Sequence, residues 1–576
     1  MYAILASLPI IVALVMMFGF KKKSGVSLLA AWATSIVLAI AVWNLNIPHA
    51  VALTIFGFLS AINVILIVFS AIFLLNSLIE LKFIETIGNG FNGITQDRRI
   101  QIIIIAYLFG AFVEGAAGFG TPGALAAPLL VALGVPVFFA ALSSLMANYS
   151  PVLFGAVGIP PVTGFNSIRP ALEAMGHDLA AQNAIFHNLN TMAALTNIFV
   201  GSFVPFLIIA AIVSRDGRKE GIKNAVNILP LSLFAGLLFT VPVYLIVTIT
   251  GSPEIPSLLS SLIALPAFIF VVKKGFLVPK EVYRFQDDPI KEAAAAKNTG
   301  VSLVTAWSPY VIIAGLLAIT RLPMLPFRDW LNHSSVTIAI TDFMGLSDPG
   351  FAALGLTRIN FSLPILNNPG IFPFIPIALI FLISRKTPSS TLAKITNKTI
   401  NQLKNAVYAL CFGVALVQVM RFTNQSILMA GFFDGLNATQ VAAQAGYMSS
   451  MTTEIAQALA GLFGGAYPIV GPLIGALGAY VSGSHTVSNV MFYGLQLETA
   501  VNLGMPIVLI LIGQTSGASI GNMVAINNAV AISATTGAHG SEGKLIAAAA
   551  VPFILCSLAI SAIMFIYLAI GFQFVA

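Results

Sequence analysis

Apolar runs long enough to cross a lipid bilayer follow one another along nearly the whole chain of 576 residues. Only 8% of the residues are charged, whereas a soluble domain carries roughly 25%. At about 20 residues per crossing, these runs provide roughly 12 to 14 transmembrane helices. No loop between them is long enough to hold a separate soluble catalytic domain. We therefore predict an all-α, polytopic membrane protein embedded in a lipid bilayer.

Basic residues gather in short loops between the apolar runs, and this pattern predicts the topology. The clusters are 21–23, 98–99, 215–223, 273–284 and 385–404, all of which we expect in the cytoplasm because positively charged loops stay inside. The N-terminus is then outside, and the net charge of +7 reflects topology, so no nucleic-acid partner is expected. The predicted spans are residues 2–20, 25–45, 50–80, 100–113, 185–213, 225–250, 256–272, 300–320, 370–384, 404–422, 455–481 and 545–572.

A glycine-rich segment, 110–123, occurs in two related copies. Its first six residues read GAFVEG and line up with GAYVSG at 478–483, after which the polar run SHTVSN stands where the first copy has AAGFGT. Further downstream, residues 148–151 and Gly155 stand opposite 514–517 and Gly521 at nearly the same offset. The chain is therefore predicted to contain an internal duplication.

The regions 114–164 and 484–540 are rich in small and polar residues with interspersed prolines, a composition typical of helices that break inside a membrane protein. The first copy is entered from the cytoplasmic side and the second from the predicted outside. Inverted repeats with discontinuous or re-entrant helical hairpins indicate a secondary transporter with its substrate site where the breaks meet. We predict an N-terminal membrane half (1–273), a cytoplasmic linker (274–299) and a C-terminal membrane half (300–576).

Glu114 lies in the first glycine-rich copy, and an ionised carboxylate is costly there. It could be protonated and hydrogen-bonded, paired with a cation, or able to gain and lose a proton during transport. His485 lies in the second copy and could titrate or serve as a buried hydrogen-bonding group. Arg421 and Arg358 could each clamp an anion or extend to the membrane surface.

Other motif readings fit the sequence less well. The spacing Gly118, Gly120, Gly123 matches a dinucleotide fingerprint, but that motif needs a soluble βαβ unit. A hydrolase triad from Ser484, His485 and Glu114 lacks a GxSxG elbow. The remaining histidines and the two cysteines have no metal-binding spacing. We expect neither an enzyme nor a metal or cofactor.

Four blocks of the sequence resemble motifs of the bacterial lactate permease family: GAFVEGAAGFGTP, ANYSPVLFGAVGIP, GSHTVSNVMFYGLQ and TSGASIGNMVAI. The resemblance covers most of the chain. It implies inverted repeats with hairpins, and transport of L-lactate, in some members D-lactate or glycolate, together with protons across the bacterial inner membrane. In place of an aspartate common in the family, this chain has His485.

The repeats predict a secondary active transporter, and the resemblance implies that it imports a small 2-hydroxy monocarboxylate, with L-lactate first among the candidates, by proton symport and alternating access. A sodium-coupled carboxylate symporter is the alternative within transport, and a passive channel or an intramembrane enzyme are the alternatives outside it. Glu114 and His485 are the predicted proton-coupling residues. The predicted substrate-binding residues are Gly115, Gly118, Gly120, Asn148, Ser484, Thr486, Asn489 and Ser516.

Overall fold

The computed structural model is a helical bundle. Within the part of the chain that it describes, nine helices are long and apolar enough to cross a membrane, one bent pair (Val137–Val152 with Gly155–Arg169, 55°) passes the same test, and five shorter helices are apolar. The predicted all-α polytopic fold is confirmed. The structure describes residues 2–20, 22–45, 47–91, 93–118, 121–217, 221–286, 299–321, 326–339, 360–366, 368, 370–421, 423, 449–538 and 541–571.

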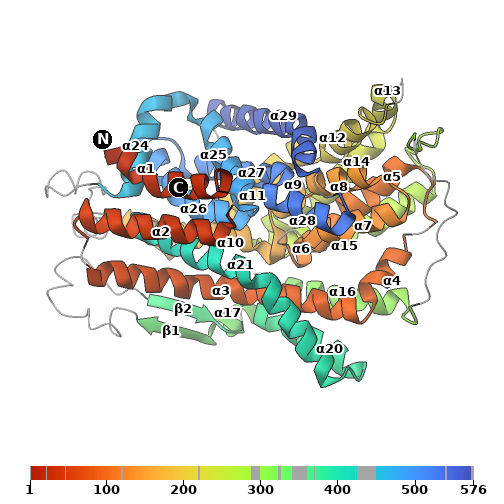
Figure 1. The fold of residues 1–576 in the computed structure, drawn as a ribbon, viewed down its shortest axis with the longest axis horizontal. Helices are drawn as coiled ribbons and strands as arrows, with labels where there is room; N and C mark the ends of the chain where they lie inside the picture. The colour runs from red at the N-terminus through yellow and green to blue at the C-terminus, as the bar shows by residue number, and fades with distance from the viewer. Residues whose placement is uncertain are drawn as a thin grey trace.

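Along one side of the molecule, the second and third helices of the chain pack against one long helix from its second half, and the first helix packs on the second (Figure 1). The contact is close, because a Cβ atom at Gly57 would lie 2.5 Å from the Cα atom of Ala415. It is also polar at one point, where the Asn76 amide donates to Thr399 Oγ1 at 3.0 Å. These helices are α1 (Tyr2–Phe18), α2 (Ser24–Ala41), α3 (Ile47–Glu80) and α21 (Ser389–Arg421).

The first repeat is a helical hairpin followed by a broken helix. The Arg98 guanidinium donates to the Leu133 carbonyl at 2.6 Å, so the turn after α7 lies at the end of the molecule where α5 begins. The chain therefore rises through α5 to α6, turns, and returns through α7. The elements are α5 (Arg98–Ile102), η1 (Ile103–Phe109), α6 (Gly110–Ala116), α7 (Thr121–Ala132), α8 (Val137–Ala147), α9 (Tyr149–Val152) and α10 (Gly155–Ala174).

The second repeat has the same order of helix, break, helix, turn, helix and break. The corresponding turns read LGVP at 133–136 and LGMP at 503–506, and the glycine of each has a positive φ, 99° at Gly134 and 63° at Gly504. These turns extend the duplication found in the sequence. The elements are α24 (Met451–Phe463), η3 (Gly464–Ala466), α25 (Tyr467–Ser482), α26 (His485–Leu503), α27 (Ile507–Gly521), η4 (Asn522–Val524) and α28 (Ile526–Thr536).

The remaining helices surround these repeats. They are α4 (Phe83–Asn89), α11 (Leu179–Gly201), α12 (Val204–Val213), α13 (Gly221–Val226), α14 (Leu229–Thr250), α15 (Pro256–Lys273), α16 (Leu303–Arg321), α17 (Phe327–Asn332), η2 (Gly370–Phe374), α20 (Ile375–Ser384) and α29 (Glu542–Ala569). Strands β1 (Ser335–Ala339) and β2 (Asn360–Pro364) form a small antiparallel pair with Ser335 opposite Pro364.

A polar cluster fastens the first part of the predicted linker to the bundle. The Asp97 carboxylate accepts from Arg99 Nη2 at 2.6 Å and from the Tyr283 backbone N–H at 3.2 Å. The Tyr283 hydroxyl donates to Asp216 Oδ2 at 2.5 Å. Segments ahead of α5, after α12 and after α15 are thereby joined. Residues 287–298 of the predicted linker lie outside the described residues.

Candidate functional site

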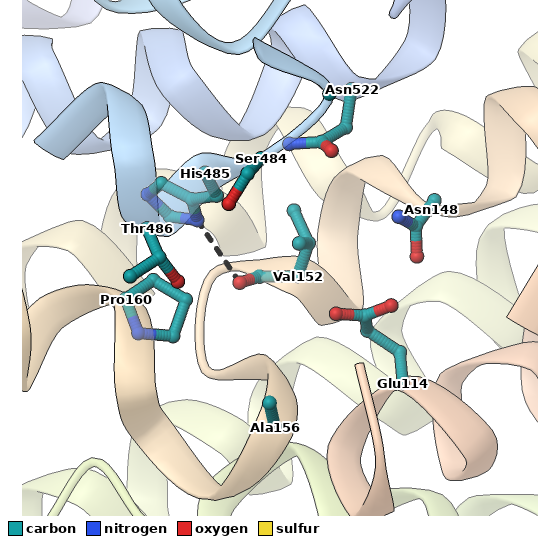
Figure 2. Close-up of a pocket in the computed structure, with 10 residues that line it drawn as sticks. Glu114, Asn148, Val152, Ala156, Pro160, Ser484, His485, Thr486 and Asn522 are labelled. Atoms are coloured by element: carbon teal, nitrogen blue, oxygen red, sulfur yellow. Dashed lines mark hydrogen bonds between the residues drawn. The ribbon is translucent and has the colours of Figure 1, made fainter. Parts of the chain in front are cut away.

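A polar cavity lies where the end of α6, the second hairpin tip and the two helix breaks meet. Its walls come from the end of α6, the α8–α10 region, the α25–α26 junction and the end of α27, which are far apart in sequence (Figure 2). The duplication predicted such a meeting point. None of the described residues that line the cavity is a lysine or an arginine; they are Glu114, Asn148, Val152, Ala156, Pro160, Gly483, Ser484, His485, Thr486 and Asn522.

Glu114 is the only acidic residue among those lining residues, and it is 2% exposed. Its carboxyl group lies against the backbone of the first-repeat break, because a Cβ atom at Gly155 would be 2.3 Å from Oε1. Asn148 at the end of α8 interacts with the same carboxyl group, and Figure 2 shows the two side chains facing one another. Glu114 Oε2 has no hydrogen-bond partner within the described structure.

The break between α9 and the main part of α10 has an unusual backbone. Ala156, Val157 and Gly158 have φ values of 45°, 57° and 72°, and the left-handed region is costly for alanine and valine. Such strain persists only where the surrounding structure enforces it, and it is frequent at functional sites. Here the Val152 carbonyl, just before the break, faces the cavity and lies within hydrogen-bond distance of the His485 ring (Figure 2).

The second hairpin tip presents the N-terminus of a 19-residue helix to the cavity. Gly483 has a φ of 70° and ends α25, and Ser484 caps α26 by accepting a hydrogen bond from the Val487 N–H at 3.3 Å. The first turn of a helix carries unpaired N–H groups and a partial positive charge, a combination that favours anions. Thr486 in that turn also lines the cavity.

His485 makes a hydrogen bond through each ring nitrogen. Nδ1 lies 3.0 Å from the Val152 carbonyl oxygen in the first repeat, and Nε2 lies 3.0 Å from Thr515 Oγ1 on α27. The side chain therefore bridges the two repeats. Asn489, one turn further along α26, donates to Thr515 Oγ1 at 3.2 Å and to the Pro160 carbonyl at 3.3 Å.

The structure brings half of the predicted site residues to the cavity wall: Glu114, Asn148, Ser484, His485 and Thr486. Asn489 lies behind this group and is linked to it through Thr515.

Three other predicted residues serve elsewhere. Gly115 packs against α15, since a Cβ atom there would lie 2.6 Å from the Leu258 nitrogen. Gly118, with a φ of 62°, forms the first hairpin tip against Ala156. Ser516 is buried within α27 and is not one of the lining residues, and Gly120 lies outside the described residues.

Asn522 and Thr515 were not among the predicted residues. Asn522 lines the cavity at the second-repeat break and accepts from the Asn528 amide at 3.1 Å. The sequence signal that could have identified Asn522 is its position directly after Gly521, in the break-prone region 484–540. Thr515 lies in the TSG sequence of the second repeat, but its neighbour Ser516 was predicted instead.

Arg421 does not extend to the membrane surface. It is 0% exposed at the end of α21, and its guanidinium donates to the Ser167 carbonyl on α10. Gly494 on α26 leaves room for it, because a Cβ atom there would lie 3.0 Å from Arg421 Cδ. Arg421 is not one of the cavity-lining residues, and Arg358 lies outside the described residues.

A polytopic helical bundle whose polar cavity is built from breaks in two repeated units has the architecture of a membrane transport protein. The sequence profile of the L-lactate permease family matches residues 2–571. The chain belongs to this family of membrane permeases.

Individual relatives agree with this assignment. The chain is 27% identical over 581 residues to the L-lactate permease of Salmonella typhimurium, covering 94% of this chain and 91% of that protein. It is 28% identical over 516 residues to the L-lactate permease of Bacillus subtilis (83% and 80%) and 28% identical over 561 residues to the glycolate permease GlcA of Escherichia coli (94% and 91%). Among solved structures, the YdaH transporter of Alcanivorax borkumensis gives a TM-score of 0.29 at 12% identity, covering 77% of this chain and 91% of that one.

Proposed function

We propose that the protein imports a small 2-hydroxy monocarboxylate, with L-lactate as the first candidate and D-lactate and glycolate as related ones, by proton symport. The names of the relatives, L-lactate permease and glycolate permease, support this class of substrate. The bacterial inner membrane is the proposed location. Such an acid is ionised at neutral pH, and moving one negative charge against a membrane potential costs about 2.3 kcal/mol per 100 mV. Cotransport with a proton removes that cost.

One observation carries the proton coupling. Glu114 faces a cavity whose described lining contains no basic lysine or arginine side chain. An ionised Glu114 repels a carboxylate in the same low-dielectric space, whereas a protonated Glu114 can donate a hydrogen bond to it. Substrate binding and protonation of Glu114 therefore favour one another, and this coupling is reciprocal. A loaded site would hold one proton and one anion with no net charge added.

The other side of the cavity would receive the substrate carboxylate. The first turn of α26 offers backbone N–H groups and a partial positive charge, and Ser484 and Thr486 supply hydroxyl groups beside them. Asn148 and Asn522 border the same space from the two breaks and could bind the 2-hydroxyl group of the substrate. Glu114 is the proposed proton carrier, and His485 the second candidate for that role.

Alternating access would expose this cavity to each side of the membrane in turn. The cavity is assembled from both repeats, so movement of one repeat against the other would open one side while it closed the other. Each of the two proposed membrane halves, 1–273 and 300–576, contributes one of these repeats, with 274–299 as their proposed cytoplasmic connection.

The test is uptake of labelled L-lactate into proteoliposomes that contain the purified protein. One set receives an inward proton gradient, a second receives an inward sodium gradient, and unlabelled D-lactate and glycolate compete in parallel sets. We expect accumulation with the proton gradient alone, and inhibition by both competitors. Accumulation with sodium alone would replace proton coupling with sodium coupling, and no uptake under either gradient would rule out lactate as the substrate.

A further inference from the structure

We propose that Thr515 is a positioning residue of the transport site: through His485 and Asn489 it fixes both ends of the first-repeat break and the N-terminus of α26 at the cavity. A kinetic test of this proposal depends on the proposed transport function. A second test, by cysteine labelling, depends only on the geometry. Thr515 is 2% exposed and is not one of the residues that line the cavity. Its effect on the substrate would therefore be indirect.

The two first-repeat carbonyls that these side chains bind flank the break. Val152 is the last residue of α9, and Pro160 follows the three left-handed residues 156–158. The three left-handed residues between these two carbonyls interrupt the regular helical backbone. His485 binds the Val152 carbonyl and Asn489 binds the Pro160 carbonyl. Side chains of the second repeat thus hold the interrupted backbone of the first.

Both side chains meet at one hydroxyl group, and the chemistry of each atom fixes the direction of the hydrogen bonds. A carbonyl oxygen only accepts, so His485 Nδ1 carries the proton that binds Val152. In a neutral imidazole Nε2 then accepts, and the Thr515 hydroxyl is its donor, 3.0 Å away. The Thr515 oxygen in turn accepts from the Asn489 amide at 3.2 Å. One threonine hydroxyl therefore orients both bridging side chains.

The break that His485 and Asn489 bind also forms part of the wall around Glu114, the proposed proton carrier. Gly155 lies within it, directly against the Glu114 carboxyl group. The other end of the bridge is the first turn of α26, where His485 follows the capping residue Ser484. A change at Thr515 should consequently reach both the proposed carboxylate-binding turn, through His485, and the proposed proton carrier Glu114, through the break.

Replacement of Thr515 by valine keeps the shape and removes the hydroxyl group. For Thr515→Val we expect the KM for L-lactate under a saturating proton gradient to rise about tenfold, the equivalent of roughly one lost hydrogen bond. Thr515→Ser keeps a donor and an acceptor and should restore KM to near the wild-type value. Thr499→Val is the matched control, because Thr499 is buried on α26 and its hydroxyl donates to the Leu495 carbonyl at 2.8 Å.

Two outcomes would overturn the proposal. They are an unchanged KM in Thr515→Val, whether or not its thermal stability falls, and a defect in Thr515→Ser as large as that in Thr515→Val. Should valine prevent folding, Thr515→Cys retains a weak donor of similar size, and an unaltered KM in that variant together with a defective Thr515→Ser would also overturn it.

A second readout needs no substrate. With Cys411 and Cys556 replaced by alanine, a single cysteine is introduced by Ala156→Cys, at a buried position in the break. We expect its rate of reaction with a small thiol reagent to rise severalfold when Thr515→Val is added, and not when Thr499→Val is added. Equal rates would overturn the proposal. If the wild-type protein transported none of the three acids, the proposed function would fail while this labelling test still decided the role of Thr515.

Discussion

The Glu114 carboxyl group and the Gly155 backbone are packed so closely that a single methyl group at position 155 would lie 2.3 Å from Glu114 Oε1. The two residues belong to different helices of the first repeat, α6 and α10. Their contact joins the hairpin tip to the helix break, and it makes the position of the carboxyl group depend on the absence of a side chain opposite it.

Gly155→Ala should therefore displace the Glu114 carboxyl group. We expect proton-driven uptake of L-lactate to fall at least about tenfold, since small misplacements of a functional group can cost that much or more, with normal amounts of protein in the membrane. Gly110→Ala in the same helix as Glu114 is the control, because its added Cβ atom would meet only the Ile105 carbonyl at 3.7 Å. Full uptake by Gly155→Ala would show that the position of the carboxyl group is not critical.

Glu114→Gln tests the proton-carrying role directly. Glutamine keeps the size and polarity of the side chain but cannot take up and release a proton. We expect loss of accumulation driven by a proton gradient, while exchange of labelled for unlabelled L-lactate across the membrane continues. Glu114→Asp retains the carboxyl group and should keep part of the accumulation. Proton-driven accumulation at the wild-type level in Glu114→Gln would rule out Glu114 as the carrier.

Gly517→Ala should destabilise the second repeat. A Cβ atom at this position of α27 would lie 1.9 Å from the Pro472 carbonyl oxygen of α25, so the two helices would have to move apart. Overpacking of this kind costs about 1–3 kcal/mol or more, and thermal unfolding in detergent should show a lower melting temperature. Gly461→Ala on α24 adds the same atom with no neighbour within 4 Å and should leave the melting temperature unchanged or higher. Equal melting temperatures for the two variants would contradict the close packing.

Asp97→Asn should destabilise the end of the bundle that the polar cluster holds together. The carboxylate binds Arg99, which is itself 2% exposed, and loss of one partner of a buried ion pair costs about 3–5 kcal/mol. The measurement is again the melting temperature. Arg284→Gln removes a charge nearby, on an exposed side chain that donates to Gln96, and should change stability by less than about 0.5 kcal/mol. A similar small effect in Asp97→Asn would show that the cluster contributes little.

Much of the architecture could be predicted because apolar length and loop charge are written directly in the sequence. The predicted spans 50–80 and 256–272 correspond to α3 (Ile47–Glu80) and α15 (Pro256–Lys273). The breaks were predicted from composition, and the duplication indicated that they would meet. Glu114 and His485 do line one cavity, as that reasoning required.

The hydrogen bonds behind the cavity could not be predicted from the sequence, for two physical reasons. The Val152 and Pro160 carbonyls belong to the backbone, so their roles depend on where the helix breaks and leave no mark in residue type. Thr515 and Ser516 are neighbours on α27, and successive helical residues point about 100° apart. Residues 508–521 of that helix are buried on every side, so no amphipathic pattern indicates which of the two faces the histidine.

The assembly of the cavity from the two repeats has a consequence for biosynthesis. Glu114 leaves the ribosome hundreds of residues before Ser484 and Asn522, and synthesis at roughly 5–20 residues per second makes that interval tens of seconds. During this time the first hairpin, with its carboxyl group and interrupted backbone, must wait in the bilayer without the side chains that later cover it. We therefore expect the protein to be most vulnerable to membrane quality control after its N-terminal half has been inserted and before its C-terminal half has been made.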